Sequence, residues 1–231
     1  MIVLRSTCAL PVQAPLPNRE RIKTQDGAVY VVDDDGPVRR SLERLVRSWG
    51  MSVESFPSAQ AFLRGPHHPG PSCLVLDLCM PGLDGIALQE ALSGTDAQIV
   101  FLSGHGDVPT CAHAMKAGAV DFLTKPVDEE KLNAAVVAAL QRSAATRESA
   151  VARSAARKRR ETLTHRELEV MQRVIAGMLN KQIAEDLGVA EKTVKIHRGR
   201  VMEKMGVTSV AKLVRIAQAA GILPVTAEMR A

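Results

Sequence analysis

The sequence predicts two domains of different class: an α/β domain with a doubly wound, five-stranded parallel sheet, followed by an all-α domain of four helices. Short apolar strands alternate with amphipathic helices five times between residues 27 and 143. After residue 161 the apolar residues show only helical periodicity, interrupted by glycines. The charge changes sign with this division, because residues 27–140 carry a net charge of −6, whereas residues 141–161 and 162–231 carry +5 and +4.

Composition limits the class of protein further. The chain has 231 residues, 46% of them hydrophobic, which is enough for two cores and excludes wholesale disorder. No run approaches the ~18 apolar residues of a membrane span. Four cysteines without C-x-x-C spacing indicate a reduced, cytoplasmic protein. Residues 1–26 contain three prolines and no periodicity, so we expect a mobile N-terminal tail rather than a signal peptide.

Each predicted strand of the first domain is followed by a helix. The strands are expected at Val29–Val32, Ser52–Phe56, Cys73–Asp77, Gln98–Leu102 and Ala119–Thr124. The helices are expected from Gly36 to Trp49, around Ala59–Leu63, at Ile86–Leu92, at Val108–Ala117 and around Leu132–Leu140. Parallel strands share one direction, so the polar residues at their carboxyl ends should converge in one cleft. These residues are Asp33, Asp34, Asp77, Ser103 and Lys125.

Such a cluster has a definite chemistry. Three neighbouring carboxylates repel one another unless a proton or a cation neutralises them, and hard oxygen ligands suit Mg²⁺. Asp77 could attack phosphorus to form an acyl phosphate. Ser103 could hydrogen-bond the transferred phosphoryl group, and Lys125 could neutralise it. The alternative for Asp77 alone is a strand-end aspartate that caps the next turn.

Three stretches resemble the receiver domain of two-component response regulators, a flavodoxin-like fold, over residues 27–143. They are Val31-Val32-Asp33-Asp34-Asp35, Leu74 through Gly85, and Phe122-Leu123-Thr124-Lys125-Pro126. Ser103-Gly104-His105-Gly106-Asp107-Val108 resembles the FixJ-type branch.

This resemblance implies roles for individual residues. Asp77 would accept phosphate from a sensor histidine kinase. Mg²⁺ would be bound by Asp34, Asp77 and the backbone carbonyl of Cys79, with Asp33 acting through water. Ser103 and Phe122 would form the switch pair, without a switch hydroxyl because Phe122 stands where many receivers have tyrosine. Asp35 would face solvent or the first helix.

Residues 144–161 read as a basic, helix-prone linker that can extend the preceding helix. Two interpretations of its Arg157-Lys158-Arg159-Arg160 run remain open. The run either contacts DNA phosphates or is a solvated charge run.

Residues 162–231 show the pattern of a helix-turn-helix domain. Thr164 and Glu167 form a capping box at the first helix, and Asn180 is expected to cap the second. The third helix begins near Glu191, and Thr208 or Ser209 begins the fourth. The third helix has a cationic face of the right size for the major groove. Its candidate DNA-binding residues are Lys192, Thr193, Lys195, Ile196, His197, Arg198 and Arg200, with Lys204 adding charge.

Residues 162–223 resemble the LuxR/NarL-type DNA-binding domain, through Leu163 to Glu167, Asn180 to Ala184, and Lys192 to Arg198. The resemblance implies that Lys195 and Ile196 face base edges, with Thr193, His197 and Arg198 nearer the backbone. The sequence departs from the family at two positions. Ala190 replaces the usual Ser or Thr cap, and Gly199 has no side chain.

Together the two resemblances predict a phosphorylation-dependent transcriptional regulator with a sensor kinase, double-stranded DNA and a second copy of itself as partners. RNA polymerase is a possible further partner, and no membrane is involved. Enzymatic activity is not expected beyond phosphoryl exchange on Asp77. Two alternatives remain. One is a phosphate-independent DNA-binding regulator. The other is a haloacid-dehalogenase-like phosphatase, because Asp33-x-Asp35-Gly36 resembles that nucleophile motif.

Overall fold

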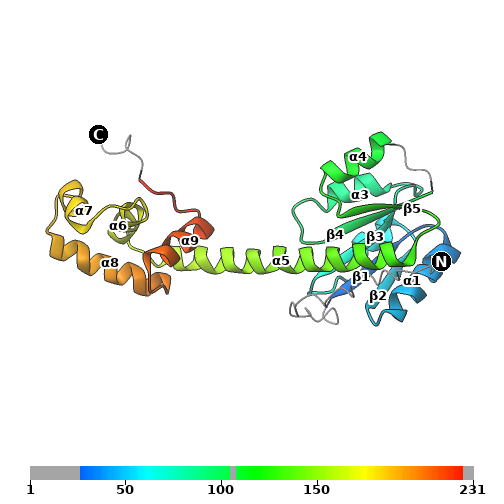
Figure 1. Ribbon diagram of the computed structural model, residues 1–231, viewed down its shortest axis with the longest axis horizontal. Coiled ribbons are helices and arrows are strands. Elements are labelled where there is room, and N and C mark those ends of the chain that lie inside the picture. Colours follow the sequence, from blue (N-terminus) through cyan, green and yellow to red (C-terminus); the bar gives the residue numbers. More distant parts are fainter. Residues whose placement is uncertain (1–26, 105–107, 226–231) are drawn as a thin grey trace, which may run out of the picture. The chain divides into compact units, whose positions relative to one another are not determined.

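The computed structural model describes residues 27–104 and 108–225, so the expected N-terminal tail lies outside the described residues (Figure 1). The chain divides into two compact units. The boundary lies within one helix, between Gln141 and Arg142, and the short segment Gly94–Ala97 is grouped with the second unit. Within the described residues, no helix is both long enough and apolar enough to cross a bilayer.

The first unit contains the predicted parallel sheet, with strand order β2-β1-β3-β4-β5 (Figure 1). The strands are β1 (Ala28–Val32), β2 (Ser52–Phe56), β3 (Ser72–Asp77), β4 (Gln98–Ser103) and β5 (Asp121–Thr124). All four strand pairs are parallel. The register places Val32 opposite Leu76, so Asp33 follows β1 at the level where Asp77 ends β3. This register brings the predicted strand-end residues to one edge.

Helices cover both faces of this sheet, as predicted for a doubly wound fold. They are α1 (Gly36–Ser48), α2 (Ala59–Arg64), α3 (Gly85–Ala91), α4 (Val108–Lys116) and the start of α5 (Glu129–Glu161). On one face, Val46 of α1 and Val136 of α5 pack against Val31, Val75 and other strand residues. On the other face, the Tyr30 ring packs edge-on against Phe62 of α2, with the ring centroids 5.4 Å apart. The result is a sheet buried on both sides, which explains its near-continuous apolar strands.

Cys73 lies in the middle of this core. Its side chain is fully buried on β3. Burial raises the pKa of the Cys73 thiol well above its ordinary value, because the thiolate would lose its hydration. Cys73 is therefore a packing residue of the sheet.

The predicted linker is helical throughout and continues the last receiver-type helix without a break. α5 has 33 residues, about 50 Å at ~1.5 Å per residue. Its first turns bury Leu132, Val136 and Leu140 in the core of the first unit. Near its end, Ala156 is 1% exposed in the core of the second unit. The helix-prone composition therefore forms one helix that contributes to both cores.

The second unit has the four predicted helices, α6 (His165–Ile175), α7 (Asn180–Asp186), α8 (Glu191–Met205) and α9 (Val210–Ala220) (Figure 1). Thr164 and Glu167 form the predicted capping box, and Ser209 caps α9. The prediction for α7 was wrong by one residue. Leu179 is its N-cap, with Gln182 accepting the Leu179 amide, while the Asn180 side chain accepts a hydrogen bond from Arg198.

Candidate functional site

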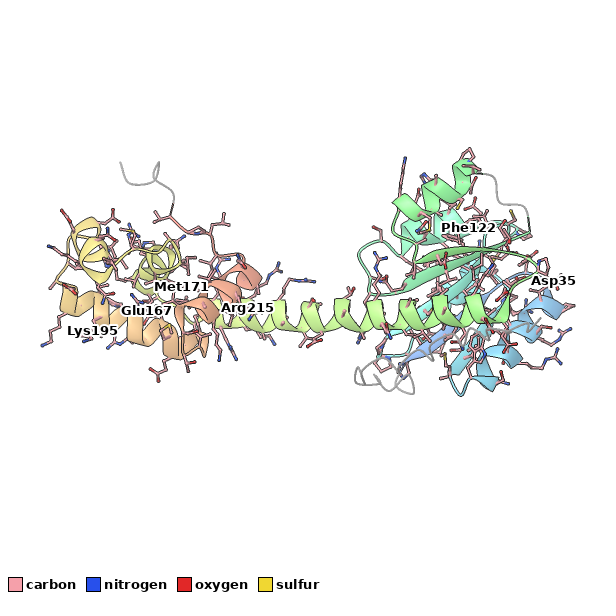
Figure 2. All side chains as sticks on the ribbon, viewed as in Figure 1. Asp35, Phe122, Glu167, Met171, Lys195 and Arg215 are labelled. Carbon is pink, nitrogen blue, oxygen red and sulfur yellow. The ribbon has the colours of Figure 1, made fainter. Side chains whose placement is uncertain are left out.

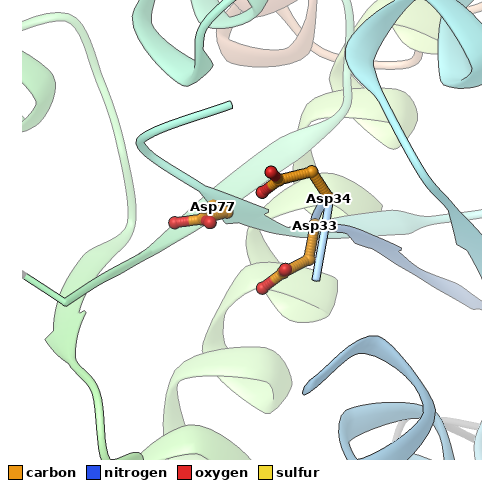
Figure 3. A group of neighbouring side chains, drawn as sticks. All are labelled: Asp33, Asp34 and Asp77. Atoms are coloured by element: carbon orange, nitrogen blue, oxygen red, sulfur yellow. The ribbon is translucent and has the colours of Figure 1, made fainter. Parts of the chain in front are cut away.

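Three carboxylates meet at the carboxyl edge of the sheet (Figure 3). Oxygens of Asp33, Asp34 and Asp77 all lie within 4.8 Å of one another. Asp33 and Asp77 are buried, whereas Asp34 is exposed. Figure 3 shows the three side chains pointing toward the same side of the strand ends. Because these are hard oxygen donors with excess negative charge, the cluster suits a divalent cation such as Mg²⁺.

Lys125 neutralises part of this charge from the end of β5. Its Nζ lies 2.8 Å from Asp33 Oδ2 and 3.2 Å from Asp77 Oδ2. Burial raises the pKa of Asp77 above its ordinary value, and the nearby Lys125 ammonium only partly opposes this effect. For Lys125, burial favours the neutral amine. The hydrogen bond and charge of Asp33, together with Asp77, outweigh it and raise the pKa of the ammonium.

The backbone that presents the acids is itself fixed. Asp35 accepts the Val38 amide as the N-cap of α1, which agrees with its expected position beside that helix. The Arg39 guanidinium donates to the carbonyls of Asp33 and Asp34, at 2.6 and 3.4 Å. Sequence reasoning missed Arg39, and no signal in the sequence distinguishes it from the exposed arginines of the same helix.

Ser103 and Phe122 lie on the neighbouring strands β4 and β5, where Phe122 pairs with Phe101 and Ser103 pairs with Thr124. Ser103 ends β4 and is fully buried, and its carbonyl accepts the Lys125 amide at 2.8 Å. Phe122 is half-buried on β5, with its ring centroid 6.1 Å from that of Phe101 (Figure 2). Phe122 therefore contacts the core through its ring and has no hydroxyl to donate toward Ser103.

In the second unit, α8 has one buried side and one cationic side. Val194, Val201 and Met205 are fully buried and form its core side. The opposite side exposes Lys192, Lys195, Gly199 and Arg200, and Ile196 is 49% exposed (Figure 2 labels Lys195). In the major groove, Lys and Arg side chains can donate to guanine edges and an apolar side chain can contact a thymine methyl group, so this side of α8 has both kinds of group.

Comparisons with known proteins identify both units. Residues 29–137 match the response regulator receiver domain, and residues 161–217 match the luxR family of bacterial regulatory proteins. Response regulator protein TmoT of Ectopseudomonas mendocina is 43% identical over 202 residues, covering 87% of this chain and 92% of the relative. Transcriptional regulatory protein FixJ of Bradyrhizobium diazoefficiens is 42% identical over 203 residues, covering 87% and 98%. This chain belongs to the FixJ-type response regulators.

Solved structures agree with this assignment. The response regulator is 44% identical to StyR, with a TM-score of 0.71 and coverage of 83% of this chain and 98% of StyR. Full-length FixJ from B. japonicum is 40% identical, with a TM-score of 0.51 and coverage of 85% and 98%. The response regulator thus has a receiver domain and a LuxR-type DNA-binding domain.

The charge predicted for Lys204 on the cationic side of α8 is paired within the domain. Lys204 is half-buried. Its Nζ lies 2.6 Å from Glu167 Oε2 and 2.9 Å from the Thr162 carbonyl oxygen, so its charge is already paired. One candidate DNA residue has a partner within the domain, because Arg198 donates to Asn180 Oδ1. For a second candidate, His197, the Nδ1 atom is buried and has no hydrogen-bond partner among the described residues.

Gly85 is a supporting residue that the motif contained but the sequence analysis did not single out. A Cβ on Gly85 would lie 2.7 Å from the Asp77 carbonyl oxygen and 3.0 Å from the Phe101 ring. We expect Gly85→Ala to shift the end of β3 and lower the unfolding free energy by about 1–3 kcal/mol. Urea denaturation measures this change, with Gly104→Ala as control because the space there is open. Equal stability of Gly85→Ala and the unsubstituted protein would show that the strand end is not crowded.

Glu167 gives the DNA-binding domain a pH dependence. The side chain is buried, which opposes ionisation, but hydrogen bonds from Lys204 and from the Thr164 amide outweigh burial and lower the pKa of the carboxyl. Because the pKa is lowered, the ionised carboxyl of Glu167 stabilises the fold at pH values above its ordinary pKa of 4.5. This contribution disappears as the pH falls through the lower pKa of the folded state. We expect Glu167→Gln to cost about 1–2 kcal/mol at pH 7 and much less near pH 3. Denaturation at both pH values measures it, and the exposed Glu203→Gln should show no such difference.

Proposed function

We propose that this response regulator accepts a phosphoryl group on Asp77 from a sensor histidine kinase and then binds promoter DNA as a dimer. The supporting observation is the shared edge where Asp77, two further carboxylates and Lys125 meet. An Asp77 oxygen attacks phosphorus, a P–O bond forms, and the P–N bond to the kinase histidine breaks. The electron pair of the P–N bond stays on the histidine nitrogen, and the ring departs as neutral imidazole because its other nitrogen carries a proton.

Each neighbouring group supplies one part of this transfer. When Mg²⁺ is bound, it neutralises phosphoryl charge, and its ligands would be Asp34, Asp77 and the Cys79 carbonyl, with Asp33 acting through water. Lys125 offers a cation toward the phosphoryl oxygens, and the Ser103 hydroxyl is a candidate donor to them. We assign to the receiver domain only the gain and loss of a phosphoryl group on Asp77.

The response to phosphate would pass through the receiver edge formed by α4 and β5. Phosphorylation adds charge beside Ser103 and biases the packing of Phe122. We infer dimerisation through α4 and β5, which lets two DNA-binding domains read two half-sites. Because DNA is the partner, the proposed location is the cytoplasm, where RNA polymerase is a further candidate partner.

In DNA binding, Lys195 and Ile196 are assigned to base edges. Lys192, Thr193, His197, Arg198 and Arg200 are assigned to the backbone or its vicinity. The exposure of Lys195 and Ile196 supports this division.

The decisive experiment is intact mass measurement after incubation with Mg²⁺ and acetyl phosphate, together with the oligomeric state in solution. We expect one added phosphoryl group and dimerisation, both lost in Asp77→Asn. An unchanged mass with both acetyl phosphate and candidate kinases would favour the phosphate-independent regulator. Phosphate uptake that survives Asp77→Asn but is lost in Asp33→Asn would favour the phosphatase.

A further inference from the structure

The end of α5 lies against the end of the recognition helix α8, within the same compact unit. Ala156 of α5 is 1% exposed in the core that also contains Val201 and Met205 of α8. One turn later, the Arg159 guanidinium donates through Nη1 to the Met205 carbonyl oxygen at 2.9 Å. Met205 is the last residue of α8, so Arg159 satisfies a backbone acceptor that the helix itself leaves open.

The geometry of the helix end fits this contact closely. Gly206 is the C-cap of α8, in the left-handed conformation with φ of 64°. A Cβ at Gly206 would lie 3.1 Å from Arg159 Nη1 and 3.2 Å from its Cζ, so the guanidinium lies directly against the cap. A cation is favourable here, because the C-terminus of a helix carries partial negative charge.

A second contact joins the same regions. Lys204 of α8 donates to the carbonyl of Thr162, and the Thr162 hydroxyl donates to the carbonyl of Arg159 at 2.7 Å. The Arg160 guanidinium is oriented toward the Ala220 carbonyl at 3.4 Å. Lys158, by contrast, is exposed and makes no hydrogen bond or ion pair among the described residues. Arg159 and Arg160 are exposed as well, but unlike Lys158 they donate to backbone carbonyls of the domain.

We propose that Arg159 is a positioning residue for DNA recognition. It fixes the C-terminal end of α8 against α5, and so sets how the other half of α8 presents Lys195 and Ile196. This inference rests on the proposed DNA binding, and it assigns Arg159 a role other than the phosphate contact considered for its segment.

The test uses the full chain and a 30-base-pair duplex selected by the phosphorylated protein from a random-sequence pool. The variants are Arg159→Ala, Arg159→Lys and the neighbouring control Lys158→Ala. For Arg159→Ala we expect roughly tenfold weaker binding with an unchanged dependence of log affinity on log salt, since no phosphate contact is lost. Arg159→Lys should recover part of the affinity, because it keeps the charge. A salt slope reduced by ~0.9 in Arg159→Ala would show a phosphate contact and overturn the proposal. Unchanged affinity in Arg159→Ala would also overturn it.

Hydrogen exchange provides a readout that needs no DNA. In Arg159→Ala, amides of residues 200–207 should exchange roughly tenfold faster, while α6 and α9 keep their protection and Lys158→Ala matches the unsubstituted protein. Faster exchange across the whole domain would show a general loss of stability, which contradicts a positioning role. If the protein selects no duplex at all, the proposed function fails, and the exchange pattern still decides whether Arg159 positions α8.

Discussion

Replacing Lys125 by methionine is expected to lower the rate of phosphorylation by about 100-fold or more, the usual effect of removing one preorganised charge from a reacting centre. Lys125 is the cation that approaches both Asp33 and Asp77 in the described structure. Methionine keeps most of the side-chain length and removes the charge. Intact mass against time with acetyl phosphate and Mg²⁺ measures the rate. Lys131→Met, an exposed lysine of α5, is the matched control.

The same substitution should change the pH dependence of phosphorylation. In the proposed reaction the Asp77 carboxylate is the nucleophile, so we expect the rate to fall as pH drops through the pKa of Asp77. Removing the Lys125 ammonium takes away a group that lowers the pKa of Asp77, so the fall should begin at higher pH in Lys125→Met. A pH profile with the same midpoint as the unsubstituted protein would contradict this coupling.

Lys125→Met should also destabilise the receiver domain without metal. The buried Asp33 carboxylate would lose the partner at 2.8 Å, at a cost of about 2 kcal/mol after allowance for the partly exposed lysine. Added Mg²⁺ should restore part of this loss, because it neutralises the same carboxylates. Denaturation with and without Mg²⁺ measures both effects.

Replacing Lys195 by alanine is expected to weaken binding to a selected duplex by about 10–100-fold, the cost of one base-edge contact. Lys195 is exposed on α8 beside Ile196 and has no ion pair among the described residues. Fluorescence anisotropy measures the affinity, with a scrambled duplex of equal length for comparison. Lys212→Ala, an exposed lysine of α9, controls for the loss of one positive charge.

The comparison between duplexes separates two roles of Lys195. A base contact predicts that Lys195→Ala loses affinity mainly for the selected sequence, so the preference over the scrambled duplex shrinks. A phosphate contact predicts equal losses on both duplexes and a reduced salt slope. Equal losses would therefore assign Lys195 to the DNA backbone and leave base recognition to other residues of α8.

Much of the receiver site could be predicted from sequence because strand direction fixes it. Because β1, β3 and β5 are parallel, their carboxyl ends lie at one edge of the sheet. This edge must therefore hold Asp33, Asp77 and Lys125, although Asp33 and Lys125 are 92 positions apart. The pairing within that edge could not be predicted. Lys125 lies nearer Asp33 than Asp77, and this choice depends on side-chain packing.

Predictions for the DNA-binding domain failed where contacts between residues far apart in sequence determine the environment of a side chain. The capping box of Thr164 and Glu167 is local and was predicted correctly. Glu167 also accepts a hydrogen bond from Lys204, which lies 37 residues later in the sequence. The two residues meet only because α6 packs against α8. Helical spacing placed Lys204 near a cationic face, but periodicity carries no information about a partner on another helix.

Two cysteines of the receiver domain differ in their access to solvent, because Cys73 is buried and Cys79 is exposed. They can therefore report on opening of the domain. Cys73 is sealed in the core with a raised pKa, so an alkylating reagent can modify it only when the sheet opens. Cys79 is exposed beside Asp77 and remains open to the same reagent while the domain is folded. The rate of Cys73 labelling therefore measures how often the sheet opens, and no cysteine has to be introduced for the measurement.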